Sequence, residues 1–599
     1  MIRRILLPVI LVVLVYGFWI SPDFKEISAG VAIFLFGMLF LEEGFRTFTG
    51  GLLEKILRNT TDRLWKSISF GIFTTTIMQS SSLVSVITIS FLSAGLIELA
   101  SGIGIIFGAN IGTTTGAWLI AGLGMKVNVS AYAMPMLVFG IILVFQKSNS
   151  LKGVGYILAG LGFLFLGIHH MKEGFEAFRN TIDLTEFAVS GVLGLFLFTA
   201  MGVFATVVMQ SSHATLVLII TALAAQQITY ENALALAIGA NVGTTITAII
   251  GSMSANYQGK RLAGAHLVFN FVTGLIAIIL INQFVTVVDV IADYVGIAED
   301  DYTLKLAVFH TIFNAVGVII MIPFINHLVR SLERVLPAPT LDLVGTKYLN
   351  SSVLDFPETL VEAVRNETFH LYENAFEIIA HGINLHRSEI LSGKDLEELI
   401  KNDRKAFEIN FDDIYERKVK VLFNEIIDFI SRGQGQIPPE YSSQLYNLRQ
   451  ANRLIVRGVK GVKHLRKNLK LYVMSDNHHI RDEYNALRLQ IACLLRDLDH
   501  LRNLSEEDRE VLELDTYKAN IEQKTSVEDG RIDRLIRKSQ ITSGMATSLL
   551  NDHGYTRDLI RSLVDIGMLL YGSKDAAQGD AEALVGLNGV DLVENTKDE

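Results

Sequence analysis

Apolar runs of membrane-spanning length dominate the first 330 residues, and this constrains the fold more than any other feature. A helix needs about 20 residues to cross the hydrocarbon core of a bilayer. Residues from about 355 onward are instead rich in Lys, Arg, Asp and Glu, so the sequence divides into a membrane part and a soluble part. The net charge of −10 argues against a nucleic-acid partner. The single cysteine, Cys493, excludes an intramolecular disulfide.

The N-terminus carries Arg3 and Arg4 before an apolar run that ends at Ile20, a pattern shared by signal peptides and first membrane helices. No small-x-small cleavage site follows at residues 21–23, and another apolar segment begins directly afterwards. A retained first membrane helix is therefore the favoured interpretation.

Ten apolar segments can be marked in the membrane part. They cover residues 5–20, 27–45, 67–97, 100–122, 130–146, 153–172, 190–224, 231–251, 262–287 and 304–328. Two of them, 67–97 and 190–224, are too long for one membrane span and too short for two.

Loop charges set the sides of the membrane, because Lys and Arg collect in cytoplasmic loops. The N-terminus, the basic loop 46–66 and the soluble part are placed in the cytoplasm, and the acidic loop 288–303 is placed outside. These assignments agree only if each overlong segment enters and leaves on one side, which predicts eight crossings and two re-entrant hairpins. The alternative is that each overlong segment is one tilted helix with an interfacial stretch.

The overlong segments are also where the sequence repeats itself. Gln-Ser-Ser at 79–81 recurs at 210–212, an offset of 131 (210 − 79). Gly-Ala-Asn-Ile-Gly-Thr-Thr at 108–114 recurs at the same offset at 239–245, with Val in place of Ile. Matched strings at one offset indicate a duplication.

A third string, Glu-Gly-Phe, occurs at 43–45 and again at 173–175. The loop after the first copy is basic, whereas the loop after the second holds Glu176, Asp183 and Glu186. Equivalent loops then lie on opposite sides of the membrane, which predicts inverted-topology repeats at about 27–146 and 153–287. Such repeats, with interrupted helices that meet near the midplane, are common in secondary transporters.

The overlong segments are expected to place polar hairpin tips inside the membrane, where non-helical backbone must be buried or line a cavity. Hydroxyls and amides can donate to an oxyanion, and their oxygens can ligate Na⁺. A helix that starts at each tip would direct its N–H groups at the anion. The candidate binding residues, of which the Asn and Thr members are expected beside short glycine turns, are Gln79, Ser80, Ser81, Ser82, Asn110, Thr113, Thr114, Gln210, Ser211, Ser212, Asn241, Thr244 and Thr245.

The membrane part has almost no buried basic side chain, so a bound polyanion would need co-bound cations to balance its charge. The alternative is that these hydroxyls and amides only satisfy hydrogen bonds between helices.

With both Gln-Ser-Ser tips and both Gly-Ala-Asn strings, residues 27–330 resemble a type II sodium–phosphate cotransporter. The resemblance implies uptake of inorganic phosphate driven by co-transported Na⁺, by alternating access and without an organic cofactor. It places the phosphate and sodium sites on the candidate residues. Sodium is expected at a subset of Gln79, Ser80, Thr113, Gln210, Ser211 and Thr244.

The sequence departs from the symmetric pattern at several positions. His213 stands where the first copy has Ser82, and a packed neutral histidine is favoured over a pH-sensitive one. The pattern His-x-x-x-Asn occurs at 266–270 and at 310–314, but its first-copy counterpart at 136–140 has lost both polar ends. Electrogenic relatives have an acidic residue at the position of Leu137, so its absence hints at an electroneutral cycle.

Residues 345–575 form long amphipathic patterns, with breaks such as 433–435 and 438–439, which predict an all-helical bundle. The region resembles a PhoU-like domain, which implies a regulatory role. The pairs Asp412/Glu416 and Glu425/Asp428 could hold a metal, although surface positions or salt bridges within a helix are favoured. Residues 576–599 are expected to be an acidic disordered tail.

The sequence as a whole predicts an all-α polytopic protein of the plasma or inner membrane, with inverted-topology repeats and two re-entrant hairpins in residues 1–335 and a cytoplasmic helical bundle. No catalytic constellation stands out, so an enzyme is not expected. Rival functions are an H⁺-coupled or other small-oxyanion transporter, and a membrane phosphate sensor that does not transport. The stoichiometry is left open, as is the choice between a monomer and a homodimer.

Overall fold

The computed structural model describes residues 2–49, 63–124, 129–179, 188–189, 191–338, 345–354, 356–403, 410–435, 437–504, 514, 516–517 and 530–571. These residues form helices, turns and bends with no strand among them, which confirms the all-α class. The chain divides into two compact units, Met1–Pro339 with Asn350–Thr359, and Thr340–Leu349 with Leu360–Glu599. The predicted acidic tail and the loop residues Lys55, Arg58, Asp183 and Glu186 lie outside the described residues.

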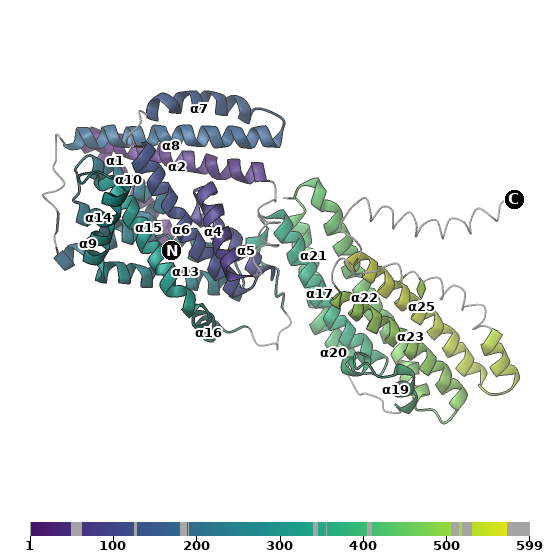
Figure 1. Ribbon diagram of the computed structural model, residues 1–599. Coiled ribbons are helices and arrows are strands. Elements are labelled where there is room, and N and C mark those ends of the chain that lie inside the picture. The colour runs from purple at the N-terminus through teal and green to yellow at the C-terminus, as the bar shows by residue number, and fades with distance from the viewer. Residues whose placement is uncertain are drawn as a thin grey trace. The chain divides into compact units, whose positions relative to one another are not determined.

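The first unit is built from helices that its apolar segments form (Figure 1). They are α1 (Ile2–Ile20), α2 (Pro22–Thr49), α4 (Leu64–Met78), α5 (Ser81–Ser93), α6 (Leu99–Trp118) with the π-helical η1 (Leu119–Gly124), α7 (Val129–Val144), α8 (Asn149–Arg179), α9 (Gly191–Met209), α10 (Ser212–Ala224), α11 (Tyr230–Gly243), α12 (Thr245–Ser252), α13 (Tyr257–Ile279), α14 (Ile281–Val295), α15 (Tyr302–Met321), the 3-10 turn η3 (Ile322–Phe324), α16 (Ile325–Val335) and the 3-10 turn η4 (Ser351–Val353).

Seven helices among the described residues are long and apolar enough to cross a membrane. They span Pro22–Thr47, Leu99–Gly122, Asn149–Phe178, Gly191–Met209, Tyr230–Ser252, Tyr257–Ile279 and Tyr302–Val335. The chain is therefore a polytopic membrane protein, while the count of eight crossings stays a prediction. Two expectations are wrong in detail. The segment 262–287 is broken at Leu280 between α13 and α14, and the expected loop 288–303 is helical as far as Val295.

Each overlong segment is a pair of helices broken at the Gln-Ser step. Gln79 ends α4 and Gln210 follows α9, and both adopt left-handed backbone with φ of 51° and 53°. The chain also has left-handed backbone just after the far ends of α5 and α10, at Gly95 (φ 75°) and Gln226 (φ 58°). These two residues lie 131 positions apart (226 − 95). The duplication seen in the sequence therefore extends to the backbone conformation.

Glycines bring the first arm of each hairpin against the helix that follows the hairpin. A Cβ on Gly71 of α4 would collide with the carbonyl oxygen of Ile105 in α6. A Cβ on Gly202 of α9 would collide with that of Leu236 in α11, both 131 positions later. Small residues let membrane helices approach this closely, so the two copies use the same packing device.

Helices α2 and α8 pack through glycines spaced seven residues apart, and Figure 1 shows α7, α8 and α2 side by side. Position numbers rise along one helix as they fall along the other, so α2 and α8 run antiparallel. The facing pairs are Gly30 and Gly167, Gly37 and Gly160, and Gly44 and Gly153.

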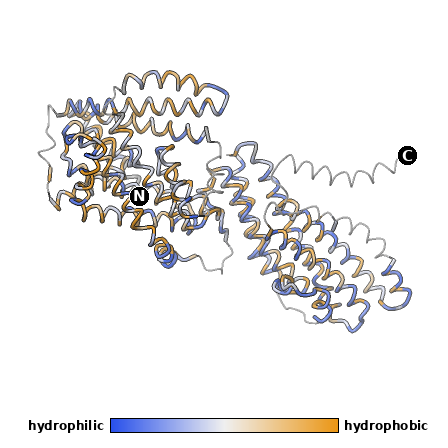
Figure 2. Tube along the Cα trace, viewed as in Figure 1, coloured by the Kyte–Doolittle hydropathy of each residue, from blue (hydrophilic) through white to orange (hydrophobic). Residues whose placement is uncertain are grey.

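The second unit consists of amphipathic helices, along which hydrophilic and hydrophobic residues alternate in Figure 2. They are α17 (Pro357–Gly382), α18 (Arg387–Ile390), α19 (Leu396–Asn402), α20 (Phe411–Tyr415), the π-helical η5 (Glu416–Lys420), α21 (Val421–Gly433), α22 (Pro439–Val473), α23 (His478–Asn503) and α25 (Ser543–Tyr571). The predicted breaks are confirmed, because α21 ends at Gly433 and α22 begins at Pro439.

The buried guanidinium of Arg488 ties α23 to the residues that directly follow α17 and α19. It donates to the carbonyl oxygens of Ile383 and Asn384, both at 2.9 Å, and to Asp403 at 2.6 Å. Burial lowers the pKa of Arg488, although the Asp403 carboxylate opposes this shift.

Three of the four acidic residues considered as metal ligands in the second unit have basic partners instead. Glu416 pairs with Lys420 and Asp428 with Arg432 within a helix, and Asp412 pairs with Lys463. These ion pairs confirm the salt-bridge interpretation for Glu416 and Asp428, and they place Asp412 in a bridge between helices.

Candidate functional site

A cavity of about 420 Å³ lies in the first unit where the two hairpin tips meet. Six of the thirteen sequence-predicted binding residues line it. The described residues that line the cavity are Leu35, Met38, Leu39 and Glu42 of α2; Ser80, Ser81 and Ser82 of the first tip; Met209, Gln210, Ser211, Ser212 and His213 of the second tip; and Thr247 of α12.

Two helices begin at this cavity, and a serine caps each of them. Ser80 accepts a hydrogen bond from the Leu83 amide at 3.3 Å, and Ser211 accepts one from the Ala214 amide at 3.2 Å. The first turns of α5 and α10 therefore face the same space with unpaired N–H groups and the positive ends of their dipoles. None of the described lining residues is a lysine or an arginine, so an anion here would be held by helix ends and hydroxyls.

The two tip glutamines are not equivalent. Gln210 lines the cavity, whereas the Gln79 side chain turns to α6 and donates to the Thr115 hydroxyl at 3.1 Å. Gln79 is half-buried and Gln210 is exposed. In this conformation Gln79 thus connects the first tip to α6 and does not line the cavity.

The Asn and Thr members of the predicted set lie outside the cavity lining, and the glycine turns expected beside them do not exist in the first copy. Helix α6 runs straight through Asn110, Thr113 and Thr114, whose side chains bond to carbonyls of the same helix at 2.7–2.8 Å. In the second copy Thr244 joins α11 to α12, and both Thr244 and Thr245 also bond to carbonyls of α11.

Asn241 belongs to a buried network with α15. Its Nδ2 donates to Asn314 Oδ1 at 2.7 Å, and its Oδ1 lies 3.0 Å from His310 Nε2. The His-x-x-x-Asn pattern of α13 is arranged alike, since Asn270 and Asn314 each donate to the carbonyl of the preceding histidine. Helix α13 packs on α5 and α6, and α15 packs on α10 and α11, so these two helices occupy equivalent positions.

The stretch 136–140, which the sequence offset pairs with α13, lies in a different environment. It belongs to α7, where Leu137 packs on Gly162 and Gly140 packs on Ala159 of α8. Its lack of polar residues follows from this position, because nothing of the stretch lines the cavity.

Each tip also reaches across to the other copy. The Ser82 hydroxyl lies 3.1 Å from that of Thr247, and the His213 ring packs where a side chain on Gly116 would be. Ser82 and His213 are equivalent positions, as are Gly116 and Thr247 (247 − 116 = 131). The larger His213 therefore meets Gly116, which has no side chain, whereas the smaller Ser82 meets Thr247. His213 is buried, and its Nε2 has no hydrogen-bond partner.

Sequence reasoning missed the contribution of α2. Leu35, Met38, Leu39 and Glu42 form one stripe of this helix that faces both tips. The Ser80 hydroxyl donates to Glu42, and the Ser211 hydroxyl donates to the Met38 sulfur at 3.6 Å. A carboxylate inside a long apolar run was the available signal, since such a residue marks a functional site by default.

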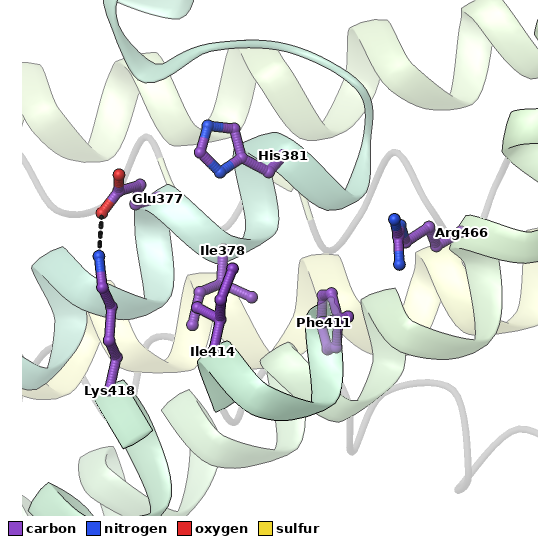
Figure 3. A pocket seen from close by; sticks show the side chains of 7 residues that line it. All are labelled: Glu377, Ile378, His381, Phe411, Ile414, Lys418 and Arg466. Atoms are coloured by element: carbon purple, nitrogen blue, oxygen red, sulfur yellow. Dashed lines mark hydrogen bonds and ion pairs between the residues drawn. The ribbon is translucent and has the colours of Figure 1, made fainter. Parts of the chain in front are cut away.

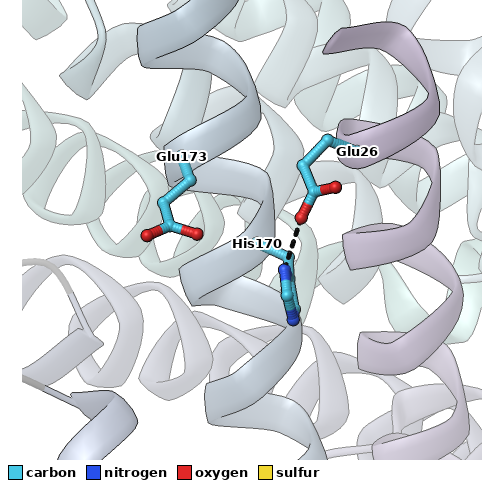
Figure 4. Close-up of side chains that lie close together, drawn as sticks. All are labelled: Glu26, His170 and Glu173. Carbon is cyan, nitrogen blue, oxygen red and sulfur yellow. Dashed lines mark hydrogen bonds and ion pairs between the residues drawn. The ribbon is translucent and has the colours of Figure 1, made fainter. Parts of the chain in front are cut away.

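Two further groups of side chains lie away from this cavity. Glu26, His170 and Glu173 bring ligand-type atoms within 4.8 Å of one another between α2 and α8 (Figure 4), and His170 already pairs with Glu26 at 2.5 Å. In the second unit a cavity of about 50 Å³ lies beside His381, Phe411 and Arg466 (Figure 3). Burial lowers the pKa of His381, which favours its neutral form.

The chain is similar in sequence to several known proteins. A "Putative inorganic phosphate export protein YjbB" of Escherichia coli and its Salmonella typhimurium namesake are 25% and 24% identical to the chain over 444 residues, 72% of this chain and 76% of each relative. The Bacillus subtilis "Uncharacterized protein YqeW" is 27% identical over 314 residues, 52% of this chain and 97% of that protein. No solved structure matches the chain significantly. Residues 33–173 and 190–336, which contain both hairpin tips, match the model of one family, and the chain belongs to that Na⁺/Pi-cotransporter family.

Proposed function

We propose that this protein transports inorganic phosphate across the membrane together with Na⁺, and that phosphate binds in the cavity between the two tips. The observation that carries the proposal is the convergence of two serine-capped helix N-termini, those of α5 and α10, on one space. Helix N-termini bind phosphate readily because their free N–H groups and dipoles favour negative charge.

The cavity also has a suitable size. A buried water needs roughly 10–15 Å³, so a cavity of about 420 Å³ can take a tetrahedral oxyanion together with waters or small cations. Ser81, Ser82 and Ser212 contribute hydroxyls to the lining that can donate to the anion oxygens, whereas the Thr247 hydroxyl donates to the Thr244 carbonyl.

Sodium coupling is proposed from charge balance. The described lining residues include a carboxylate, Glu42, and no lysine or arginine, so the site lacks a fixed positive charge to match a phosphate ion. A co-bound cation would supply it. The family description, which names Na⁺, supports sodium as that cation.

Alternating access is proposed through inverted-topology repeats. The antiparallel glycine contacts of α2 and α8 support this, because equivalent helices of repeats with opposite topology run in opposite directions. We place both termini in the cytoplasm from the loop charges, and the second unit is proposed as a cytoplasmic regulatory domain.

The direction proposed is import, driven by the inward sodium gradient. The name of the Escherichia coli relative favours export as the second candidate. A coupled carrier runs either way according to its gradients, so the same cavity would serve both directions.

Uptake of radiolabelled phosphate into proteoliposomes, with and without a sodium gradient, tests the proposal. We expect saturable uptake that requires Na⁺ outside. Proton-driven uptake would favour the H⁺-coupled alternative, and uptake of another oxyanion in preference to phosphate would reassign the substrate. Binding of phosphate with no transport under any gradient would favour a sensor.

Substitution of the tip glutamines makes the test specific. Gln79→Ala and Gln210→Ala are each expected to abolish uptake, which would be measured as a loss of roughly tenfold or more. Each variant loses a polar group that positions or binds a charged substrate. Gln226→Ala is the matched control, since Gln226 has the same left-handed backbone but lies outside the cavity lining. Near-normal uptake in either tip variant would make the tips structural.

A further inference from the structure

Glu42 is the acidic side chain among the described residues that line the cavity. It ends the stripe of α2 that begins with Leu35, Met38 and Leu39, and it is half-buried. Charged groups are expensive within membrane spans, so a carboxylate at this position needs a partner in at least one state of the protein.

Its partner here is the cap of helix α5. The Ser80 hydroxyl accepts from the Leu83 amide, so the single hydroxyl proton of Ser80 is the one donated to Glu42. The carboxyl group is thereby held at the N-terminal end of α5, beside the place proposed for the oxyanion.

The second tip offers no such group. Ser211 caps α10 as Ser80 caps α5, but its hydroxyl meets the uncharged sulfur of Met38. Lys172 takes the place of Glu42 in the second copy, because the Glu-Gly-Phe strings of the two copies are 130 positions apart (172 − 42). The negative charge of the cavity therefore lies on the side of the first tip alone.

A carboxylate and a phosphate oxyanion in one cavity repel each other, and the described lining residues hold no lysine or arginine to separate them. His213 is the other titratable lining residue, but its ring nitrogen Nε2 lies where a side chain on Gly116 would be and makes no hydrogen bond. A cation bound at Glu42 would remove this repulsion.

We propose that the carboxylate of Glu42, with the Ser80 hydroxyl beside it, is where the co-transported cation binds, and that this cation makes the cavity able to accept the oxyanion. The proposal rests on the proposed function and adds the residue that links cation and anion. Na⁺, which the family description names, is the expected cation, and H⁺ is the alternative that the experiment below distinguishes.

A purely structural role for Glu42 makes a different prediction. Glutamine has the same shape and can accept the same hydrogen bond from Ser80, so Glu42→Gln would keep a cap-supporting contact while removing the charge. Glu42→Gln therefore loses activity only if the function of Glu42 requires its negative charge. Glu42→Asp keeps the charge and should retain part of the coupling.

The experiment measures phosphate uptake by the full-length protein in proteoliposomes, as a function of Na⁺ at fixed pH and as a function of pH without Na⁺. In Glu42→Gln we expect the half-activating cation concentration to rise at least about tenfold, or activation to vanish. Glu43→Gln is the matched control, because the neighbouring Glu43 is exposed on α2 and outside the cavity lining. Phosphate-dependent thermal stabilisation, with and without Na⁺, reports binding in any variant that no longer transports.

Loss of sodium activation in Glu42→Gln, with Glu43→Gln unchanged, supports the inference with sodium as the cation. If Glu42→Gln loses activation by protons but keeps activation by sodium, the inference is supported with H⁺ as the cation. Unchanged cation activation in a transporting Glu42→Gln overturns it while the proposed function stands. A Glu42→Gln protein that is stabilised by phosphate with the wild-type dependence on Na⁺ also overturns it. Failure of the wild-type protein to transport phosphate would instead remove the proposed function.

Discussion

At the scale of single residues, the two copies differ where each tip contacts the other copy. Ser82 meets Thr247 through a hydrogen bond, and His213 fills the space left by Gly116. The pair Ser82 and Thr247 and the pair His213 and Gly116 have similar total side-chain volumes. In the first pair the residue of α12 is the larger, and in the second pair the residue of the tip is the larger. The pair of His213 and Gly116 is therefore a compensated exchange, in which the absence of a side chain at Gly116 is required.

Gly116→Ala tests this exchange. The new Cβ would overlap the His213 ring and lie 2.9 Å from Gln79 Oε1. Overpacking of this kind costs about 1–3 kcal/mol, and it would displace both tips at once. We expect reduced thermal stability and at least about a tenfold loss of phosphate uptake.

The second substitution His213→Ser should reverse this loss, because it restores the serine of the first copy and empties the crowded space. Uptake and unfolding temperature of the single and double variants give a double-mutant cycle. Normal uptake in Gly116→Ala alone, or no recovery in the double variant, would contradict the compensated exchange.

The sequence predicted six of the residues that line the cavity, because serine and glutamine interrupt an apolar segment at the same place in both copies. It could not exclude Asn110 or Thr113, because a side chain that bonds to its own helix looks the same in sequence as one that faces a ligand. It also missed Glu42, whose place beside Ser80 depends on how α2 packs against the first tip.

At the scale of elements, both Gln-Ser tips break a helix, whereas the two glycine strings behave differently, because only the second is followed by a break, at Thr244 between α11 and α12. The string 108–114 suggested a turn, yet α6 is continuous through it and its glycines serve close contact with α4. Conversely, the break between α13 and α14 at Leu280 has neither glycine nor proline to announce it. Tertiary packing overrides local signals in both cases.

The glycine contacts of α2 and α8 lead to a prediction about this pair of helices. In Gly160→Ala the new Cβ would lie 2.7 Å from the Leu41 amide nitrogen and 2.8 Å from the Gly37 carbonyl oxygen. Backbone cannot move aside as a side chain can, so we expect destabilisation by about 1–3 kcal/mol. Because Glu42 follows Leu41 on α2, uptake should fall as well.

Gly122→Ala is the control for this prediction, since a Cβ on Gly122 of η1 would meet nothing within 4 Å. Thermal unfolding of both variants in detergent and phosphate uptake in proteoliposomes provide the measurements. Equal stability of the two variants would show that α2 and α8 can separate without consequence.

At the scale of the whole molecule, the family match lies within the first unit, and so do both hairpin tips and the cavity. The first unit also includes the segment Asn350–Thr359. In this segment the carbonyl of Ser352 accepts a hydrogen bond of 2.8 Å from Ser90 of α5. The chain that leads to the second unit thus contacts the helix whose other end faces the cavity, a connection that the sequence did not indicate.

A chain that ends at Thr359 is therefore expected to keep cation-dependent phosphate uptake, because it retains every described residue of the site and the contact of Ser352 with α5. If the second unit regulates transport, the uptake rate or the half-saturating phosphate concentration should differ from that of the full chain.

A chain that ends at Ala338 is the matched comparison. It lacks the Ser352 contact, and any additional change in its kinetics reports what that contact does to α5. Identical kinetics for all three chains would contradict a regulatory role for the second unit. Loss of uptake in the folded Thr359 chain would make that unit part of the transport machinery itself.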